Sequence, residues 1–308
     1  MLTIMATQVV NGKGFEWAVA SACSDLLGLK IELSPEQRYA KECFLSLSDE
    51  KQTHFRRCAE RAVEYVVNTE MPTVGAPGLV TLAGDDAGIT GDVRDVLLSI
   101  GGKAVGFSCK TNHEAFKHSR LSSTIDFVQK WGLGVGCSQA YWQQVRPVFE
   151  ELQGIKKDSK GSMKWSEIPN YQQRYYIPVL LAWREELLRV AGGTSEANKK
   201  AASALCHYII GRIDFWKVIA TASEVRLYAF NINRTLGTNT TKLPDRIVDI
   251  DSIDGSEYSM TVHMNNGFQF NFRIHNASSR VEPSLKFDVQ AEGLPTQQVH
   301  QHTISVKA

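Results

Sequence analysis

The sequence predicts an α/β protein in which a mixed sheet flanked by helices is followed by a mixed region of helices and antiparallel strands. Apolar residues recur at helical spacing in residues 14–28 and 48–69, which is typical of amphipathic helices. Apolar runs flank a Gly-Gly pair at 101–102, and strand-like runs flank Asn-Asn-Gly at 265–267. Both are turn signals of β-hairpins. Helices and paired strands are therefore expected along most of the chain.

The first elements are predicted to be helix, helix and strand. Helices are expected over residues 14–28 and 48–69, and a short strand over 79–83. The apolar face of the first helix would comprise Phe15, Val19, Ala22 and Leu26.

The next element is a hairpin around the glycines at 101–102. If these two glycines form the turn, Asp95 lies opposite Ser108. Side chains alternate between the two faces of a strand, and directly opposed residues share a face. The same register predicts an apolar, core-facing side made of Val96, Leu98, Val105, Phe107 and Cys109.

The opposite face of this hairpin would carry Asp95, Ser108 and Lys110. A carboxylate and a lysine on one face can bind a divalent metal ion and position a water molecule. The alternative is a solvated Asp at a strand start and a solvated Lys at a strand end, without a catalytic role. Spacing alone leaves both interpretations open.

Helices dominate the middle of the chain. A helix is expected near 122–131, capped by Ser122 or Ser123, and another over 138–153. The polar, glycine-containing segment 155–164 suggests a boundary between a first domain, 1–155, and a second, 156–308. Further helices are expected over 169–191 and 195–210, and strands from Glu224 onward, including 258–264, 268–274 and 284–290.

The composition sets limits on the class of protein. The chain has 308 residues, 43% of them hydrophobic, and a net charge of +1. No apolar run reaches the length of a membrane span, and the N-terminus lacks the pattern of a secretory signal. Six cysteines without zinc spacing suggest reduced thiols in a cytoplasmic protein.

Two local clusters of basic and polar residues offset the neutral total charge, because a binding surface needs only local positive potential. The first follows the hairpin and suits contacts with phosphate; it comprises Asn112, His113, Lys117, His118 and Arg120. The second follows a late strand. Arg and Asn are residue types that read base edges, although a solvated polar loop would look similar. It comprises Arg273, His275, Asn276, Arg280 and Lys286.

The hairpin resembles the core of the PD-(D/E)XK nuclease superfamily, in which an Asp begins one strand and an acidic residue, any residue and a Lys end the next. The wider context is similar to type II restriction endonucleases of the HaeIII family, which cut GGCC. The resemblance runs through most of the chain, and the segments that carry it are GDVRDVLL, GFSCKTNHEAFKHSRLS, YIIGRIDFWKV and FRIHNASSRVEPSLKFDVQ.

The resemblance implies that Asp95 and the backbone carbonyl of Cys109 bind Mg²⁺ and that Lys110 acts in catalysis. Ser108 stands where the superfamily has an acidic residue. A hydroxyl is a poor Mg²⁺ ligand, so another carboxylate is expected to supply the missing charge. Glu16 is favoured, since superfamily members often carry a Glu on the first helix. The other candidates are Glu64, Asp86 and Asp92.

The implied activity is Mg²⁺-dependent hydrolysis of double-stranded DNA at a specific site, leaving a 5′-phosphate and a 3′-hydroxyl. The alternative is a DNA-binding module that no longer cuts, with Ser108 as the mark of a degenerate site. The expected partners are double-stranded DNA and, in the same host, a cognate DNA methyltransferase. A two-fold homodimer is the simplest way to cut both strands, although a monomer cutting them in sequence is the alternative.

Overall fold

The computed structural model describes residues 7–32, 34–70, 76–84, 92–112, 115–253 and 256–306. The chain forms two compact units. The first comprises Met1–Glu114, Gly211–Lys242 and Thr296–Ala308, and the second comprises Ala115–Ile210 and Leu243–Pro295. Each unit therefore combines segments that are distant in sequence.

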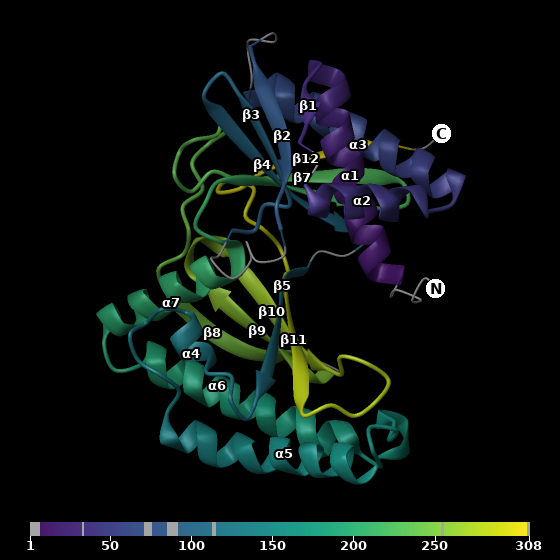
Figure 1. The fold of residues 1–308 in the computed structure, drawn as a ribbon. Helices are drawn as coiled ribbons and strands as arrows, with labels where there is room; N and C mark the ends of the chain where they lie inside the picture. The colour runs from purple at the N-terminus through teal and green to yellow at the C-terminus, as the bar shows by residue number, and fades with distance from the viewer. Residues whose placement is uncertain are drawn as a thin grey trace. The chain divides into compact units, whose positions relative to one another are not determined.

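Three helices lie together on one side of the sheet in the first unit (Figure 1). They are α1 (Thr7–Leu27), α2 (Pro35–Leu45) and α3 (Asp49–Glu70). The sequence predicted α1 and α3, but not α2. Helix α2 begins with a capping box, in which Ser34 accepts from the backbone of Gln37 and the Gln37 side chain accepts from the backbone of Ser34. This is a sequence signature of a helix N-terminus.

Within the described residues, the first unit contains a mixed sheet of seven strands in the order β1-β2-β3-β4-β6-β7-β12. Neighbouring strands are parallel at β1/β2 and β4/β6 and antiparallel elsewhere. The strands are β1 (Lys30–Ile31), β2 (Gly78–Leu82), β3 (Val96–Ile100), β4 (Lys103–Thr111), β6 (Phe215–Ala220), β7 (Glu224–Phe230) and β12 (His300–Ser305).

The predicted hairpin is confirmed as β3 and β4. Val96 pairs with Phe107, and Ile100 with Lys103. The turn glycines, Gly101 and Gly102, have φ angles of 54° and 83°, a conformation that favours glycine. This is the register expected for a two-residue turn, so the β4 partner of each residue in β3 follows from the position of the turn.

The core of the first unit lies between the helices and the apolar face of this sheet. Phe15 and Val19 of α1 are fully buried against it, together with Val63 and Val66 of α3. A fully buried aliphatic or aromatic side chain contributes about 1.5–3 kcal/mol. The predicted apolar hairpin residues Val96, Leu98, Val105, Phe107 and Cys109 all belong to this core.

The end of α3 is anchored to the sheet by a buried carboxylate. Glu70 accepts hydrogen bonds from Lys103 Nζ at 3.0 Å and from Trp216 Nε1 at 3.0 Å. It also accepts one from the backbone N–H of Gly237 at 2.6 Å. A buried charge is tolerated only when it is paired and hydrogen-bonded. These contacts connect the end of α3 to β4, to β6 and to the loop that contains Gly237.

Among the described residues, the second unit contains a five-stranded antiparallel sheet in the order β5-β11-β10-β9-β8, covered on one face by helices (Figure 1). Trp183 of α6 packs on Phe272 and Phe287, with ring centroids 4.5 and 4.9 Å apart. The strands are β5 (Ala115–Ser122), β8 (Ile247–Ile253), β9 (Ser256–Met264), β10 (Gln269–His275) and β11 (Ser284–Ala291). The helices are α4 (Phe127–Lys130), α5 (Gln139–Asp158), α6 (Ile177–Ala191) and α7 (Ser195–Ile210).

Two sequence expectations differ from the structure. The helix expected near 122–131 is reduced to the single turn α4, because β5 continues to Ser122 and pairs with β11. The expected division at residue 155 falls within α5, inside the second unit. Strand β6 follows this position in the sequence but belongs to the sheet of the first unit, since it pairs with β4.

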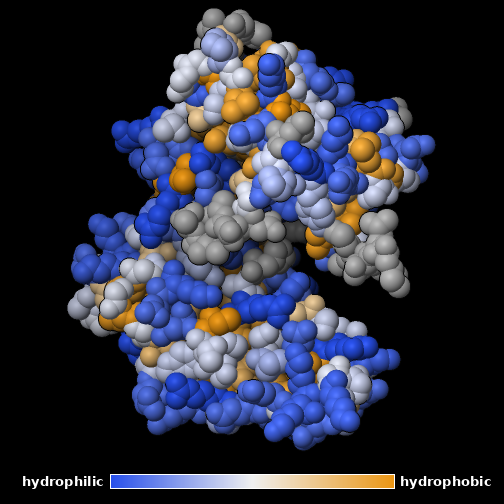
Figure 2. Space-filling model, in the orientation of Figure 1, coloured by the Kyte–Doolittle hydropathy of each residue, from blue (hydrophilic) through white to orange (hydrophobic). Residues whose placement is uncertain are grey.

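The surface seen in Figure 2 is largely hydrophilic, and its hydrophobic residues lie in small separate groups. None of the described helices is long and apolar enough to span a membrane. All six cysteines lie in the described part of the chain and are free thiols.

Candidate active site

The structure brings Asp95, Ser108 and Lys110 together at the start of β3. Asp95 precedes the strand and continues its ladder, because its backbone N–H donates to the Phe107 carbonyl at 2.7 Å. One carboxylate oxygen of Asp95, Oδ2, lies 3.3 Å from Lys110 Nζ and 3.4 Å from Ser108 Oγ. The same oxygen accepts from the backbone N–H of Cys109 at 2.6 Å. The predicted polar face of the hairpin is thus a single hydrogen-bonded cluster.

Lys110 is a cation at neutral pH in this cluster. Burial is the largest influence and disfavours its charged form, but the nearby negative charges, that of Asp95 first, together with the hydrogen bond to Asp95 outweigh it, so the pKa of Lys110 lies above its ordinary value. Lys110 can therefore donate hydrogen bonds and stabilise negative charge, but it cannot accept a proton. The Lys110 and Asp95 side chains each remain 24% exposed, so a substrate can reach them.

Glu16 faces this cluster from α1. It is 8% exposed and lies 3.1 Å from Lys13 Nζ. Burial is the main reason that its pKa is raised to about 7, and the negative charge of Asp95 raises it further. Electrostatic coupling to both Asp95 and Lys110 places Glu16 near the hairpin residues. The carboxylate favoured from the sequence thus lies within electrostatic range of Asp95.

The other three candidate ligands differ from Glu16. Asp92 is held by Arg94, whose Nε and Nη2 lie 2.9 and 2.7 Å from its two oxygens. Burial raises the pKa of Asp92, but the side-chain and backbone hydrogen bonds from Arg94, together with the charge of Arg94, lower it by more, so its charge is already compensated. The Glu64 side chain is 56% exposed and lies 3.6 Å from Arg61 on the surface of α3. Asp86 lies outside the described residues.

The residues present fit a hard divalent cation. The negative charge of Asp95 raises the pKa of the buried Glu16 carboxylate, so the two groups repel each other, and a cation between them would relieve that repulsion. Within the described ranges there is no group of three or more His, Cys, Asp or Glu side chains that could hold a metal ion. Mg²⁺ does not need such a group, because it is usually bound by one or two carboxylates together with water and substrate phosphates.

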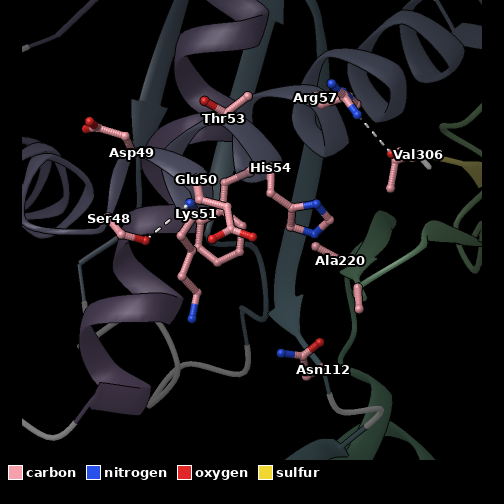
Figure 3. A pocket seen from close by; sticks show the side chains of 12 residues that line it. Ser48, Asp49, Glu50, Lys51, Thr53, His54, Arg57, Asn112, Ala220 and Val306 are labelled. Atoms are coloured by element: carbon pink, nitrogen blue, oxygen red, sulfur yellow. Dashed lines mark hydrogen bonds between the residues drawn. The ribbon is translucent and has the colours of Figure 1, made fainter. Parts of the chain in front are cut away.

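A cavity of about 830 Å³ lies at the end of β4, between the first turns of α3 and the end of β6. Lys51 and Asn112 face the same space from two sides (Figure 3). His54 Nε2 lies 2.8 Å from the carbonyl of Thr221, which leaves its ring at the cavity wall. Asn112, expected to contact phosphate, thus lies two residues beyond Lys110 in a polar recess.

Four of the other predicted DNA contacts share the polar face of the five-stranded sheet. Arg273 pairs with Asp288, and His275 pairs with Lys286. Lys286 in turn pairs with Arg120 on β5, and directly opposed residues share a face. We call Arg120, Arg273, His275 and Lys286 the basic row; two segments about 150 residues apart in sequence build it.

Asp288 lies within the basic row and orients one of its members. Its Oδ2 lies 2.5 Å from His275 Nε2, and His275 Nδ1 lies 2.9 Å from the carbonyl of Asn276. Asn276 donates to the carbonyl of Ser278 at 2.7 Å, so it forms part of the turn after β10. Arg280 is exposed at the end of that turn.

Lys117 does not belong to this surface. It pairs with Val289 on the opposite face of the sheet, and its ammonium lies 4.7 Å from the centre of the Tyr208 ring on α7. Burial, and then the charge of Lys130, lower the pKa of Lys117. Lys117 therefore lies on the face opposite to Arg120, because residues three apart on a strand face opposite sides. His118 of β5 pairs with Asp288 of β11, and His113 lies outside the described residues.

One further charged residue of this site was not singled out from the sequence. Lys217 lies on β6 as the direct neighbour of Ser108 on β4. No local sequence pattern predicts that Lys217 pairs with Ser108, because β4 and β6 are parallel strands separated by about 100 residues. Only the pairing of the two strands brings Lys217 to the site.

Comparison with known proteins identifies the family of this chain. Residues 12–295 match the family model of HaeIII restriction endonuclease. The chain is 31% identical over 307 residues to the type II restriction enzyme HaeIII of Haemophilus aegyptius, an alignment that covers 92% of this chain and 94% of that protein. No solved structure matches the chain. The match over nearly the whole length shows that this chain belongs to the HaeIII restriction endonuclease family.

Proposed function

We propose that this restriction endonuclease hydrolyses double-stranded DNA at GGCC in a Mg²⁺-dependent reaction that leaves a 5′-phosphate and a 3′-hydroxyl. The first compact unit would be its nuclease domain, of the PD-(D/E)XK type. The observation that carries the proposal is the cluster at β3, where Asp95 Oδ2 lies 3.3 Å from Lys110 Nζ and Glu16 faces both. The relative from Haemophilus aegyptius, named HaeIII, supports GGCC as the target through the resemblance described above.

Asp95 and Glu16, with the backbone carbonyl of Cys109, would hold the Mg²⁺ ion. When bound, the ion supplies Lewis-acid stabilisation of the scissile phosphate and lowers the pKa of a bound water. Ser108 keeps the Asp95 carboxylate in place through its hydroxyl and cannot itself supply charge. Glu16 takes over the charge that the superfamily places at position 108.

Lys110 acts on the attacking water and on the phosphate. It remains protonated, so it donates hydrogen bonds rather than accepting a proton. Its ammonium orients the water for in-line attack and stabilises the negative charge that develops on the phosphate. The reaction then needs no covalent enzyme intermediate. Aspartate and lysine are both required, because the first places the cation and the second places the nucleophile.

The basic row of the second unit is proposed to contact DNA, with Arg273 and Lys286 reading guanine in the major groove. Arg120 and Asn112 would contact phosphates. Arg280, His275 and Asn276 complete the proposed surface. We further propose a two-fold dimer that cuts both strands of the palindrome and a DNA methyltransferase of the same specificity in the host.

Alanine variants of the two central residues test the proposed chemistry. Asp95→Ala and Lys110→Ala should each abolish cleavage of plasmid DNA and still shift a GGCC duplex in a gel. Glu64→Ala removes an exposed carboxylate from the same unit, and this control should cut normally. Full activity of purified Asp95→Ala or Lys110→Ala would refute the assignment. A wild-type protein that shifts the duplex and never cuts it would instead indicate a binding module.

Base reading is tested separately from phosphate contact. Arg273→Ala should lower affinity for GGCC by about 1–3 kcal/mol and leave affinity for a scrambled duplex nearly unchanged. Binding to both duplexes by fluorescence anisotropy gives the ratio directly. An unchanged ratio would remove Arg273 from the base-reading set.

A further inference from the structure

Arg94 lies beside the proposed active site, on the same face of the sheet. It directly precedes Asp95 in the sequence. Its side chain lies over Gly106 of β4, where an added Cβ atom would overlap Arg94 Cγ and Cδ. Side chains alternate between the two faces of a strand, so a Cβ at 106 would project to the face that carries Ser108 and Lys110. The Arg94 side chain therefore covers this face two residues along β4 from Ser108.

Asp92 holds one edge of this guanidinium and leaves another edge open. Arg94 Nε donates to Asp92 Oδ1 at 2.9 Å, and Nη2 donates to Oδ2 at 2.7 Å. A guanidinium has five N–H groups, and within the described part of the chain Nη1 has no partner. The N–H groups of Nη1 and the second N–H of Nη2 form the open edge. Such an edge matches the geometry of a phosphate group, which accepts two parallel hydrogen bonds from it.

Stability alone does not account for this arrangement. The Arg94 and Asp92 side chains are only 19% and 21% exposed, and the cost of removing two charges from water offsets most of their attraction. Glycine within a strand weakens the strand and often marks the close approach of another group. Here that group is the stem of Arg94. An oriented cation is thus held against β4 at a cost in stability, which is the arrangement expected of a residue that binds an anionic substrate.

We propose that Arg94 is a substrate-binding residue of the active site, whose open edge binds the phosphate next to the scissile phosphate on the cleaved strand. This inference rests on the proposed nuclease function. Lys110 serves the reacting phosphate beside Ser108, and Gly106 lies about 7 Å further along β4, so Arg94 holds a neighbouring phosphate. Asp92 is a positioning residue that acts through Arg94 and does not bind the metal ion.

The test pairs a change in the enzyme with a change in the DNA. Arg94→Met keeps an unbranched stem over Gly106 and removes the guanidinium, and Asp92→Asn removes the charge that orients it. Both variants and the double variant are compared with wild type in single-turnover cleavage of a GGCC duplex. Varying the concentration of excess enzyme gives the second-order rate constant.

A set of duplexes carries one uncharged methylphosphonate at each phosphate flanking the cut. Arg61→Met is the matched control, because Arg61 also has an acidic partner, Glu64 at 3.6 Å, but on the exposed surface of α3. Urea unfolding of each variant confirms that it is folded under the conditions of the assay.

Arg94→Met should lower the second-order rate constant for the unmodified duplex by about 10- to 100-fold, the range expected for a lost hydrogen bond between charged groups. One flanking methylphosphonate should slow the wild type by a similar factor. The same duplex should slow Arg94→Met by less than about threefold, because both changes remove one interaction. Asp92→Asn should slow the wild type but cause no further loss in Arg94→Met. Arg61→Met should match the wild type on every duplex.

Two results with Arg94→Met would overturn the inference. One is a wild-type rate constant. The other is a slow, folded variant that responds to every methylphosphonate as the wild type does, which would assign a purely structural role to the arginine. Equal rates of the wild type on all the duplexes would also overturn it, and that measurement needs no variant.

The role of Asp92 is tested by the double variant. A further loss of cleavage on adding Asp92→Asn to Arg94→Met would contradict a role exercised through Arg94, because a metal ligand would act independently of the arginine. Failure of the proposed function looks different, because the wild type itself would then leave the unmodified duplex intact in Mg²⁺.

Discussion

Replacing Glu16 by Gln should stabilise the metal-free protein while abolishing its cleavage activity. Glu16 is 8% exposed, and burial together with the charge of Asp95 raises its pKa from 4.5 to about 7. The carboxylate is therefore under electrostatic strain at neutral pH in the absence of a cation. Gln keeps nearly the same shape and removes the charge.

The magnitude follows from the pKa. A rise from 4.5 to about 7 corresponds to about 3 kcal/mol, since one pKa unit is about 1.4 kcal/mol. The folded protein binds this proton more tightly than the unfolded chain. The contribution of Glu16 to stability is thus complete below pH 4.5 and is lost as the pH rises through 7. Glu16→Gln should exceed the wild type by about 3 kcal/mol at pH 8 and by about 1 kcal/mol at pH 5.5.

Urea unfolding in EDTA at these two pH values measures the difference in the free energy of unfolding. Glu64→Gln is the matched control, because Glu64 is exposed beside Arg61, and its variant should stay within about 0.5 kcal/mol of wild type at both pH values. A Glu16→Gln variant less stable than wild type at pH 8 would refute the reasoning. So would a difference that does not change with pH.

Three further variants test particular contacts. Gly106→Ala should destabilise the protein by about 1–3 kcal/mol, because a Cβ at 106 would lie 2.0 Å from Arg94 Cδ; urea unfolding of Gly106→Ala, Arg94→Ala and the double variant should show less than additive losses. Glu70→Ala should cost about 3–5 kcal/mol in the same assay, since it leaves Lys103 and two N–H groups without their shared acceptor. Arg120→Ala should weaken DNA binding and reduce the slope of log K against log salt by about 1, whereas Lys117→Ala, on the helix-covered face, should leave that slope unchanged. Equal slopes for the two variants would contradict the placement of the basic row.

The hairpin and its polar face could be predicted from the sequence because the information is local. A Gly-Gly turn between apolar runs fixes one register, and that register sets Asp95 opposite Ser108. The helix that carries Glu16 is likewise marked by its own apolar spacing. Its approach to Asp95 was expected only through the resemblance to known nucleases.

Pairings between distant segments could not be predicted in the same way. Strand β5 was interpreted as a polar segment, because its partner β11 lies about 170 residues away. The pairing of β4 with β6, which brings Lys217 to the site, also has no local signal. The face to which each β5 side chain points could be assigned only once the strand and its register were known. That register puts Lys117 and Arg120 on opposite faces of the sheet.

Cleavage of a supercoiled plasmid with a single GGCC site tests the central claim most directly. The wild-type protein with Mg²⁺ should convert the plasmid to one linear product whose ends lie within GGCC and carry 5′-phosphates. Wild type in EDTA and Asp95→Ala in Mg²⁺ should both leave it supercoiled. Linear product from Asp95→Ala, or cleavage by the wild type in EDTA, would contradict the account.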